Sequence, residues 1–324
     1  MTPTRSLLTA LALLASIATS ATSASAQTPP PVWAYPVPAP DFKPIPDDGI
    51  PRHVAGSSVT MSVTQTRDRF AAPDWHPDSH PKMPPIVATG RKPEILACGF
   101  CHRADCSGGP ENANLTGLSA DYMAQQLRDF KSGARKSSVP NRLAITLKTG
   151  IAKAITDEEI ATATAYFATF PARSNVTVIE AATVPETYVA GTYVAKKPNG
   201  GTEPIGSRIV EFPEDFDQFE NRDTNARFIA YVPPGSIARG RDLATSGANG
   251  TTIACATCHG ETLKGAGPIP QLAGRSPSYL TRQLHDFKST NRNGEAAALM
   301  KPTVENLTPP DIIALAAYLA SLAP

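Results

Sequence analysis

The chain contains the pentapeptide Cys-x-x-Cys-His twice, as Cys98-Gly99-Phe100-Cys101-His102 and as Cys255-Ala256-Thr257-Cys258-His259. This spacing is the attachment pattern of c-type haem. Two thiols add to the two vinyl groups of one porphyrin, and the adjacent histidine offers an imidazole nitrogen to the iron. A lone Cys-x-x-Cys would equally suit a zinc ribbon or a thiol redox site. Two copies that each end in histidine instead predict two covalently bound haem c groups. The predicted haem-binding residues are Cys98, Cys101, His102, Cys255, Cys258 and His259.

The amino terminus has the pattern of a secretory signal. Arg5 is followed by an apolar run over residues 7–17, and small residues lead to Ala24-Ser25-Ala26. The run is too short to span a bilayer, so we expect residues 1–26 to be a cleaved signal peptide. The mature chain is then exported to the periplasm without an integral membrane segment. This agrees with haem attachment being completed outside the cytoplasm.

The composition describes a nearly neutral chain of 324 residues, with 30 basic and 29 acidic side chains. Nothing in this balance indicates a nucleic-acid partner. Four of the five cysteines belong to the haem motifs, which leaves Cys106 alone and excludes an internal disulfide framework. An aromatic content of 6% and 32 prolines are typical of small helical domains joined by irregular connections, in which haem supplies much of the core.

The two halves of the chain are copies of one unit. Aligning the motifs gives an offset of 157 residues (255 minus 98). Pairs related by this offset include Tyr122 and Tyr279, Gln126 and Gln283, and the Asp-Phe-Lys-Ser stretches at residues 129–132 and 286–289. Further along, Thr156 matches Thr308 at an offset of 152, because the first half has five extra residues before it. Agreement over a whole stretch indicates duplication and two domains.

Each half is predicted to contain a first, a middle and a last helix. Apolar positions at helical spacing place the first two near residues 86–91 and 120–131, and near 236–243 and 277–289 in the second half. The last helix of each half opens with a capping box, Thr156-x-x-Glu159 or Thr308-x-x-Asp311. Gly90 and Gly240 are predicted to let the first helix approach the last closely.

We therefore predict a mainly α fold with two tandem domains, at residues 84–171 and 234–324. Residues 27–83 are rich in proline and are expected to form an extended arm. Residues 172–233 are predicted to be a long irregular connector. Its stretches at residues 176–179 and 208–211 have strand character.

The order of these features resembles class I cytochromes c. Each half has a first helix, Cys-x-x-Cys-His, Leu-x-Gly, Tyr-x-x-x-Gln-Leu-x-x-Phe, and a last helix with Ala-Tyr before Phe or Leu. In tandem, the halves are similar to the bacterial two-haem cytochromes of the c-four group. The resemblance covers about residues 84–171 and 234–323. It implies two class I cytochrome c domains that act as a periplasmic electron carrier or as the cytochrome subunit of a dehydrogenase.

The resemblance assigns a complete ligand set to the second haem. Met300 lies between the middle and last helices, in the loop that supplies the distal thioether in this family. It is therefore expected to bind the iron opposite His259, where a thioether favours ferrous iron and raises the potential. Pro270 matches the family proline whose carbonyl accepts a hydrogen bond from the proximal imidazole and orients that ring.

The first haem departs from this pattern, because residues 131–156 contain no methionine or histidine. The offset of 152 matches Met300 with Lys148, which binds iron only as a neutral amine, and deprotonating a buried lysine is costly. Upstream, His76, His80 and Met83 stand where the second half has two alanines and a proline. We predict Met83 as the sixth ligand, with His76, His80, Lys148 or an open position as the alternatives.

These features predict a protein that passes single electrons between two haems and redox partners such as a dehydrogenase, an oxidase or another cytochrome. No catalytic residue is predicted, because no acid–base group is placed near the distal loop. The alternative is a di-haem enzyme, peroxidase-like or oxidising sulfur compounds, with the first haem as its catalytic centre. Binding of cyanide or carbon monoxide at the first haem would distinguish the two hypotheses.

Overall fold

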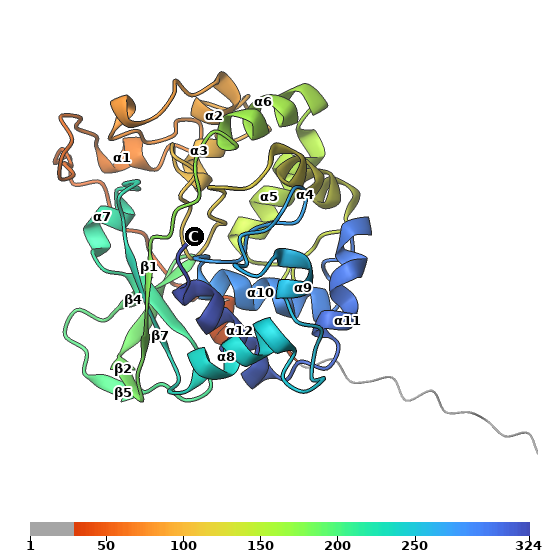
Figure 1. Cartoon of the computed structure of the whole chain (residues 1–324). Coiled ribbons are helices and arrows are strands. Elements are labelled where there is room, and N and C mark those ends of the chain that lie inside the picture. The colour runs from red at the N-terminus through yellow and green to blue at the C-terminus, as the bar shows by residue number, and fades with distance from the viewer. Residues whose placement is uncertain (1–28) are drawn as a thin grey trace, which may run out of the picture.

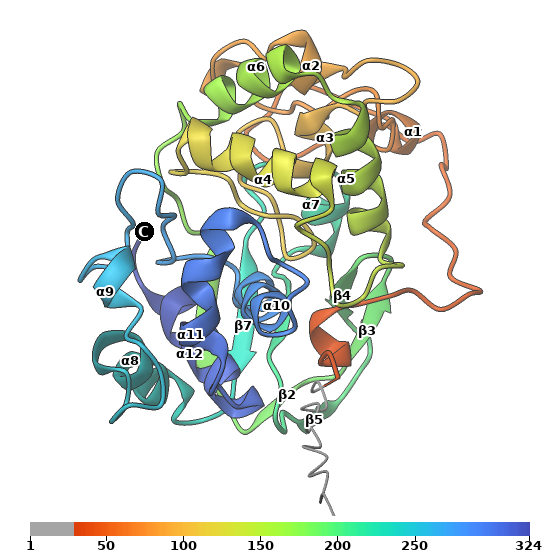
Figure 2. The same cartoon turned by 90° about the vertical axis from the view of Figure 1, so that its right-hand side faces the viewer.

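The computed structural model describes residues 29–324, so the predicted signal peptide at residues 1–26 lies outside the described residues. Helices prevail in both halves of the chain, and the strands gather in the segment between them (Figure 1). The turned view shows the first half above the second, with the strands beside the second half (Figure 2). Within residues 29–324, no helix combines the length and the apolar character needed to cross a membrane.

The first half contains five helices that surround one apolar core. They are α2 (Pro85–Ala88), α3 (Cys98–His102), α4 (Ala120–Ser132), α5 (Leu143–Ala154) and α6 (Asp157–Phe167). The predicted capping box is present: Thr156 Oγ1 accepts from the Glu159 N–H, and the Glu159 carboxylate accepts from the Thr156 N–H. Helix α2 is shorter than predicted. Gly90 follows it in a tight turn with a φ of +67°, and not at a helix crossing.

The second half repeats this order. Its helices are α8 (Ser236–Ser246), α9 (Ala256–His259), α10 (Pro277–Lys288), α11 (Lys301–Val304) and α12 (Pro309–Ser321), with the 3-10 helix η3 (Glu295–Met300) before α11. The predicted capping box at Thr308 and Asp311 is present. Helix α8 packs on α12, and Gly240 lies at their crossing as predicted. A Cβ atom at this position would lie 2.7 Å from the Cβ of Tyr318.

The segment at residues 172–233 is not irregular as predicted, because it contains all seven described strands. They are β1 (Val176–Glu180), β2 (Thr183–Pro185), β3 (Thr187–Ala190), β4 (Tyr193–Lys196), β5 (Thr202–Pro204), β6 (Val210–Pro213) and β7 (Phe228–Val232), with helix α7 (Phe216–Glu220) before β7. The two stretches predicted to have strand character, residues 176–179 and 208–211, overlap the first and the sixth of these strands. Strand β7 lies in the middle of a sheet, parallel to β1 and antiparallel to β6. Strands β2 and β5, and β3 and β4, form antiparallel pairs.

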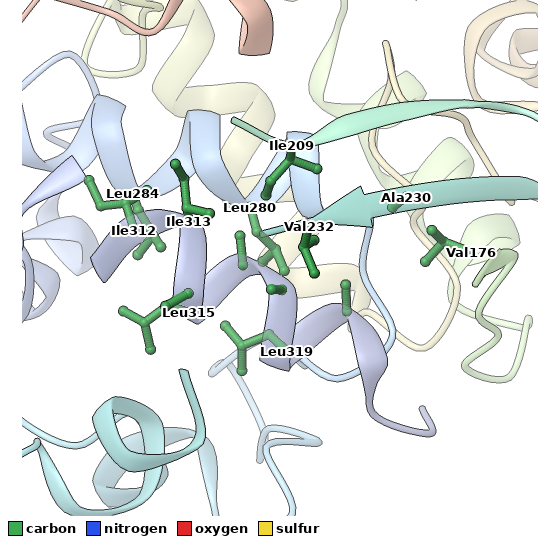
Figure 3. Packing of buried hydrophobic residues seen from close by; sticks show 14 of the residues in the cluster. Val176, Ile209, Ala230, Val232, Leu280, Leu284, Ile312, Ile313, Leu315 and Leu319 are labelled. Carbon is green, nitrogen blue, oxygen red and sulfur yellow. The ribbon is translucent and has the colours of Figure 1, made fainter. Parts of the chain in front are cut away.

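The three-stranded sheet belongs to the core of the second half. Alternate residues of β7 are buried, namely Phe228, Ala230 and Val232, as expected for a strand with one face on a core. They form one apolar cluster with side chains of α10 and α12, and Figure 3 shows Val232 near Leu280 in this cluster. The connector is therefore an ordered part of the fold, and its buried side chains belong to the same apolar cluster as Cys255 of the second haem motif.

Both ends of the segment at residues 29–83 pack against the rest of the chain, contrary to the predicted extended arm, whereas residues 39–51 between them are exposed. The segment contains η1 (Val32–Ala34), α1 (Val63–Thr66) and η2 (Pro77–Ser79) and is otherwise irregular. Tyr35 is 2% exposed, and its hydroxyl donates to Asp286 Oδ1 of α10 at 3.0 Å. Trp75 is 1% exposed, and its Nε1 donates to the Asn221 carbonyl at 2.6 Å. These two aromatic side chains anchor the segment to the second half and to the connector.

Candidate haem-binding sites

The first Cys-x-x-Cys-His motif forms the short helix α3. His102 at its end is buried, and Cys98 and Cys101 are half-buried. The Nδ1 atom of His102 lies 2.9 Å from the carbonyl oxygen of Ala113. A carbonyl oxygen only accepts hydrogen bonds, so Nδ1 carries the proton and Nε2 keeps its lone pair. This is the tautomer that an iron ligand requires.

The second motif has the same arrangement. Its first residue, Cys255, is buried and directly precedes helix α9, while Cys258 is exposed. The Nδ1 atom of His259 lies 2.8 Å from the carbonyl oxygen of Pro270, which again leaves Nε2 with the lone pair. The offset of 157 relates Pro270 to Ala113, so equivalent carbonyls orient the two imidazoles. The sequence prediction missed Ala113 because it looked for a proline, although a backbone carbonyl does not depend on the side chain.

Both turns fit a covalently attached haem. Each brings two thiols and a buried imidazole with an available Nε2 into one turn of chain, which is the donor set of haem c. Each also borders an apolar core, since Cys98 packs against the core of the first half and Cys255 belongs to that of the second. The residues present therefore suit a large apolar macrocycle with an iron at its centre.

The two methionines predicted as axial ligands are each partly buried against the core of their half. Met300 ends η3 directly before α11 and is partly buried against the core of the second half, the cluster that includes Cys255. Met83 lies just before α2 and packs, partly buried, against the core of the first half. Both roles stay predictions.

Lys148 is the side chain that meets His102. It projects from the middle of α5, and its Nζ lies 3.2 Å from His102 Nε2. Burial, together with the positive charge of Lys148, lowers the pKa of His102 to about 3, so the imidazole stays neutral. Burial also lowers the pKa of Lys148, while the nearby Cys98 and Cys101 thiols act in the opposite direction. The amine thus lies beside the helix that carries the two thiols and the imidazole of the first motif.

The other upstream candidates are held by different partners. His76 Nε2 lies 3.0 Å from Asp223 Oδ1 in the connector. His80 Nε2 lies 3.1 Å from Asp74 Oδ1, and its Nδ1 lies 3.2 Å from the Tyr166 hydroxyl. These contacts give both histidines a structural role in fixing residues 74–80 to the connector and to α6.

A buried network of paired residues joins the two halves. Arg135 Nη1 and Nη2 donate to Gln126 Oε1 and Gln283 Oε1, each at 2.7 Å. Arg292 Nη2 and Nη1 donate to the same two oxygens, at 2.8 Å and 3.2 Å. Arg292 also bonds the Tyr122 hydroxyl, as Arg135 bonds that of Tyr279.

This network has an approximate two-fold symmetry that follows from the duplication. Arg135 and Arg292 are related by the same offset of 157 as their partners, and each guanidinium also lies over a phenylalanine ring, Phe130 or Phe287. Neither arginine forms an ion pair among residues 29–324. The sequence analysis missed both residues, although the offset relates them.

Comparisons with known proteins identify similar cytochromes. The cytochrome c family model matches residues 237–323. A cytochrome c-554(548) from Halomonas halodenitrificans is 40% identical over 21% of this chain and 82% of that protein. The thiosulfate dehydrogenase electron acceptor of Stutzerimonas stutzeri is 27% identical over 72% of this chain and 82% of that protein. Cytochrome c4 of Azotobacter vinelandii is 24% identical over 71% of this chain and 86% of that protein.

The helical halves and their Cys-x-x-Cys-His turns define a c-type cytochrome, the class of protein that holds haem covalently. The chain belongs to the cytochrome c family, and over most of its length it is similar to cytochromes c4. The predicted resemblance to the two-haem c-four group is thereby confirmed.

Proposed function

We propose that this chain is a periplasmic di-haem cytochrome that passes single electrons between its two haems and outside redox partners. The observation that carries the proposal is the buried network around Arg135 and Arg292, which joins equivalent residues of the two haem-binding halves. Electron transfer between buried cofactors depends on their proximity and needs no acid–base group. An interface that fixes the two halves against each other meets that requirement.

Each haem would be held by residues already described. Cys98 and Cys101 would form the thioether bonds of the first haem, with His102 as its proximal ligand. The second haem would use Cys255, Cys258 and His259, with the Met300 thioether as its sixth ligand. When bound, haem supplies reversible one-electron chemistry at its iron. The carbonyls of Ala113 and Pro270 orient the proximal rings.

The two buried guanidiniums would compensate the negative charge of haem. Arg135 and Arg292 hydrogen-bond to amide and hydroxyl oxygens, and neither forms an ion pair with another residue in the range 29–324. Haem carries two propionate carboxylates, and a guanidinium is well suited to bind a carboxylate. We expect propionates of both haems to lie against this network. The network would then also raise the potentials of both irons, because nearby positive charge favours the reduced form.

The partner is proposed to be a dehydrogenase, an oxidase or another cytochrome. Similarity to a thiosulfate dehydrogenase electron acceptor over most of both chains supports a dehydrogenase as the donor. The alternative function, catalysis at the first haem, would require a free or displaceable sixth position. The Lys148 amine, 3.2 Å from His102 Nε2, weighs against such a position.

Haem counting tests the proposal directly. The full chain, produced in a host that matures c-type cytochromes, should contain two covalent haems by pyridine haemochrome and by intact mass. The double variant Cys98→Ala/Cys101→Ala and its counterpart Cys255→Ala/Cys258→Ala should each keep one haem. A single haem in the native chain would overturn the di-haem assignment. Rapid mixing with a redox partner should show both haems being oxidised and reduced reversibly, and an inert second haem would contradict the electron-transfer role.

A further inference from the structure

We infer that the Lys148 amine, in its neutral form, is the sixth ligand of the first haem iron, in place of Met83. This inference rests on the proposed function, because it requires a haem attached at Cys98 and Cys101. It goes further by naming the group that distinguishes the first iron from the second.

The first argument is the direct contact between the two nitrogens. Lys148 Nζ lies 3.2 Å from His102 Nε2, the ring atom that keeps its lone pair because Nδ1 donates to Ala113. The amine therefore faces the atom through which His102 would bind iron. A sixth ligand would have to approach the iron from the side opposite His102, and Lys148 lies on that side.

The second argument is the position of Lys148 relative to the other haem-attaching groups. Lys148 contacts His102, which lies on the same short helix α3 as Cys98 and Cys101. The amine therefore lies beside the turn that carries all three groups that would hold the first haem. Met83 is partly buried against the apolar core of the first half, and His76 and His80 lie against Asp223 and Asp74.

The third argument comes from the duplication. Lys148 lies eight residues before Thr156, and Met300 lies eight residues before Thr308 (156 minus 148 and 308 minus 300). Both threonines begin the capped last helix of their half. Lys148 therefore stands at the place in the first half where the second half has its predicted axial methionine.

An amine is a harder donor than the thioether predicted for the second haem, and it stabilises ferric over ferrous iron. We therefore expect the first haem to have a lower reduction potential than the second.

The test compares the ferric spectra of the native protein with those of three variants. The native protein should show a methionine-to-iron charge-transfer band equivalent to one haem of its two, together with two distinct low-spin ferric EPR signals. Lys148→Met should double the intensity of the band and bring the two midpoint potentials closer together. Lys148→Ala should convert the first haem to a high-spin or water-ligated form that binds cyanide faster. Lys153→Ala, which removes an exposed lysine from the same helix, should leave both spectra unchanged.

Met83→Ala completes the experiment. An unchanged band and unchanged EPR signals are expected, whereas the loss of half of a two-haem band would assign the ligand to Met83 and overturn the inference. An unchanged EPR spectrum of Lys148→Ala would overturn it as well. Haem counting on each sample separates a failure of this inference from a failure of the proposed function. If the protein holds two haems but the Lys148 substitutions leave the spectra unchanged, only the assignment of the ligand is refuted. If no haem is attached at Cys98 and Cys101, both the inference and the proposed function are refuted.

Discussion

Two glycines inside helices offer a matched test of how the second half is packed. Gly240 lies in α8 where this helix crosses α12, and Gly150 lies in α5 with no heavy atom within 4 Å of an added Cβ. Replacing either glycine by alanine favours the helical backbone by about 1 kcal/mol. We expect the same substitution to have opposite effects on stability at the two positions.

The magnitude follows from the distances at the crossing. A Cβ on Gly240 would lie 2.6 Å from the carbonyl carbon of Ala314 and 2.7 Å from the Cβ of Tyr318, where ordinary contact begins near 3.4 Å. These are backbone and Cβ atoms that cannot rotate away, so the two helices must separate. Overpacking of this kind costs up to about 3 kcal/mol, which leaves a net loss of about 2 kcal/mol for Gly240→Ala after the helical gain of about 1 kcal/mol.

Guanidinium chloride denaturation followed by far-ultraviolet circular dichroism would measure both variants in the haem-loaded protein. Gly240→Ala should lower the denaturation midpoint and Gly150→Ala should raise it slightly, with a difference of about 3 kcal/mol between them. If both variants were equally stable, or if Gly240→Ala were the more stable, the close approach of α8 and α12 would be refuted.

Three further substitutions test the interface, a helix cap and the amino-terminal segment. Arg292→Met removes hydrogen bonds from a charged donor inside the interface and should lower the free energy of unfolding by about 3 kcal/mol by denaturant titration. Glu159→Gln keeps the capping box but loses the Arg91 ion pair, so it should cost less than about 1 kcal/mol at pH 7 by thermal denaturation. Tyr35→Phe removes one of several donors to Asp286 and should cost about 1 kcal/mol by thermal denaturation.

For each of these substitutions, one outcome would contradict the physical explanation given for the predicted effect. The hydrogen bond from Arg91 holds the pKa of Glu159 below its ordinary value. Its contribution is thus present above about pH 4.3 and disappears as the pH falls through the folded-state pKa. A Glu159→Gln effect that persisted at pH 2 would refute this origin. Arg292→Met should perturb the potentials of both haems, and an effect on one alone would contradict the shared network. Tyr35→Phe with native stability would mean that the segment is not anchored there.

The helices of both halves could be predicted because their signals are local. The capping boxes at Thr156 and Thr308 lie within four residues of sequence, and both are present in the structure. The duplication supplied a second example of each helix. Strand character was predicted for the stretches that form β1 and β6, but the sheet was not, because its strands are short and β1 pairs with β7 from 52 positions away (228 minus 176). Period-two patterns of that length do not identify a distant partner.

The haem-attaching residues were predictable because covalent chemistry fixes their spacing, whereas the interface was not. Arg135 and Arg292 lie in the irregular segments that follow α4 and α10, and arginine in such a place is usually solvated. Only the packing of the two halves buries them against Gln126 and Gln283. The offset of 157 marked the two arginines as equivalent, yet equivalence by itself does not distinguish an interface residue from a surface residue.

The difference between the two irons is concentrated in one segment of the duplicated unit. The first half has five more residues than the second between the middle helix and the capped last helix. In this segment the first half forms the regular helix α5, whereas the second half forms η3 and the short helix α11. Lys148 is in the middle of α5 and Met300 is at the end of η3. A change of length and a change of ligand thus occur together.

This coincidence gives the proposed electron path a direction. Lys148 projects from the middle of the regular helix α5, and its amine already contacts His102 Nε2 at 3.2 Å. With a hard amine at the first iron and a soft thioether at the second, the first haem is the weaker oxidant. An electron that enters at the first haem then moves downhill to the second. Two thioether sites of equal potential would lack that bias, which is why Lys148→Met should slow net transfer toward the second haem without removing either cofactor.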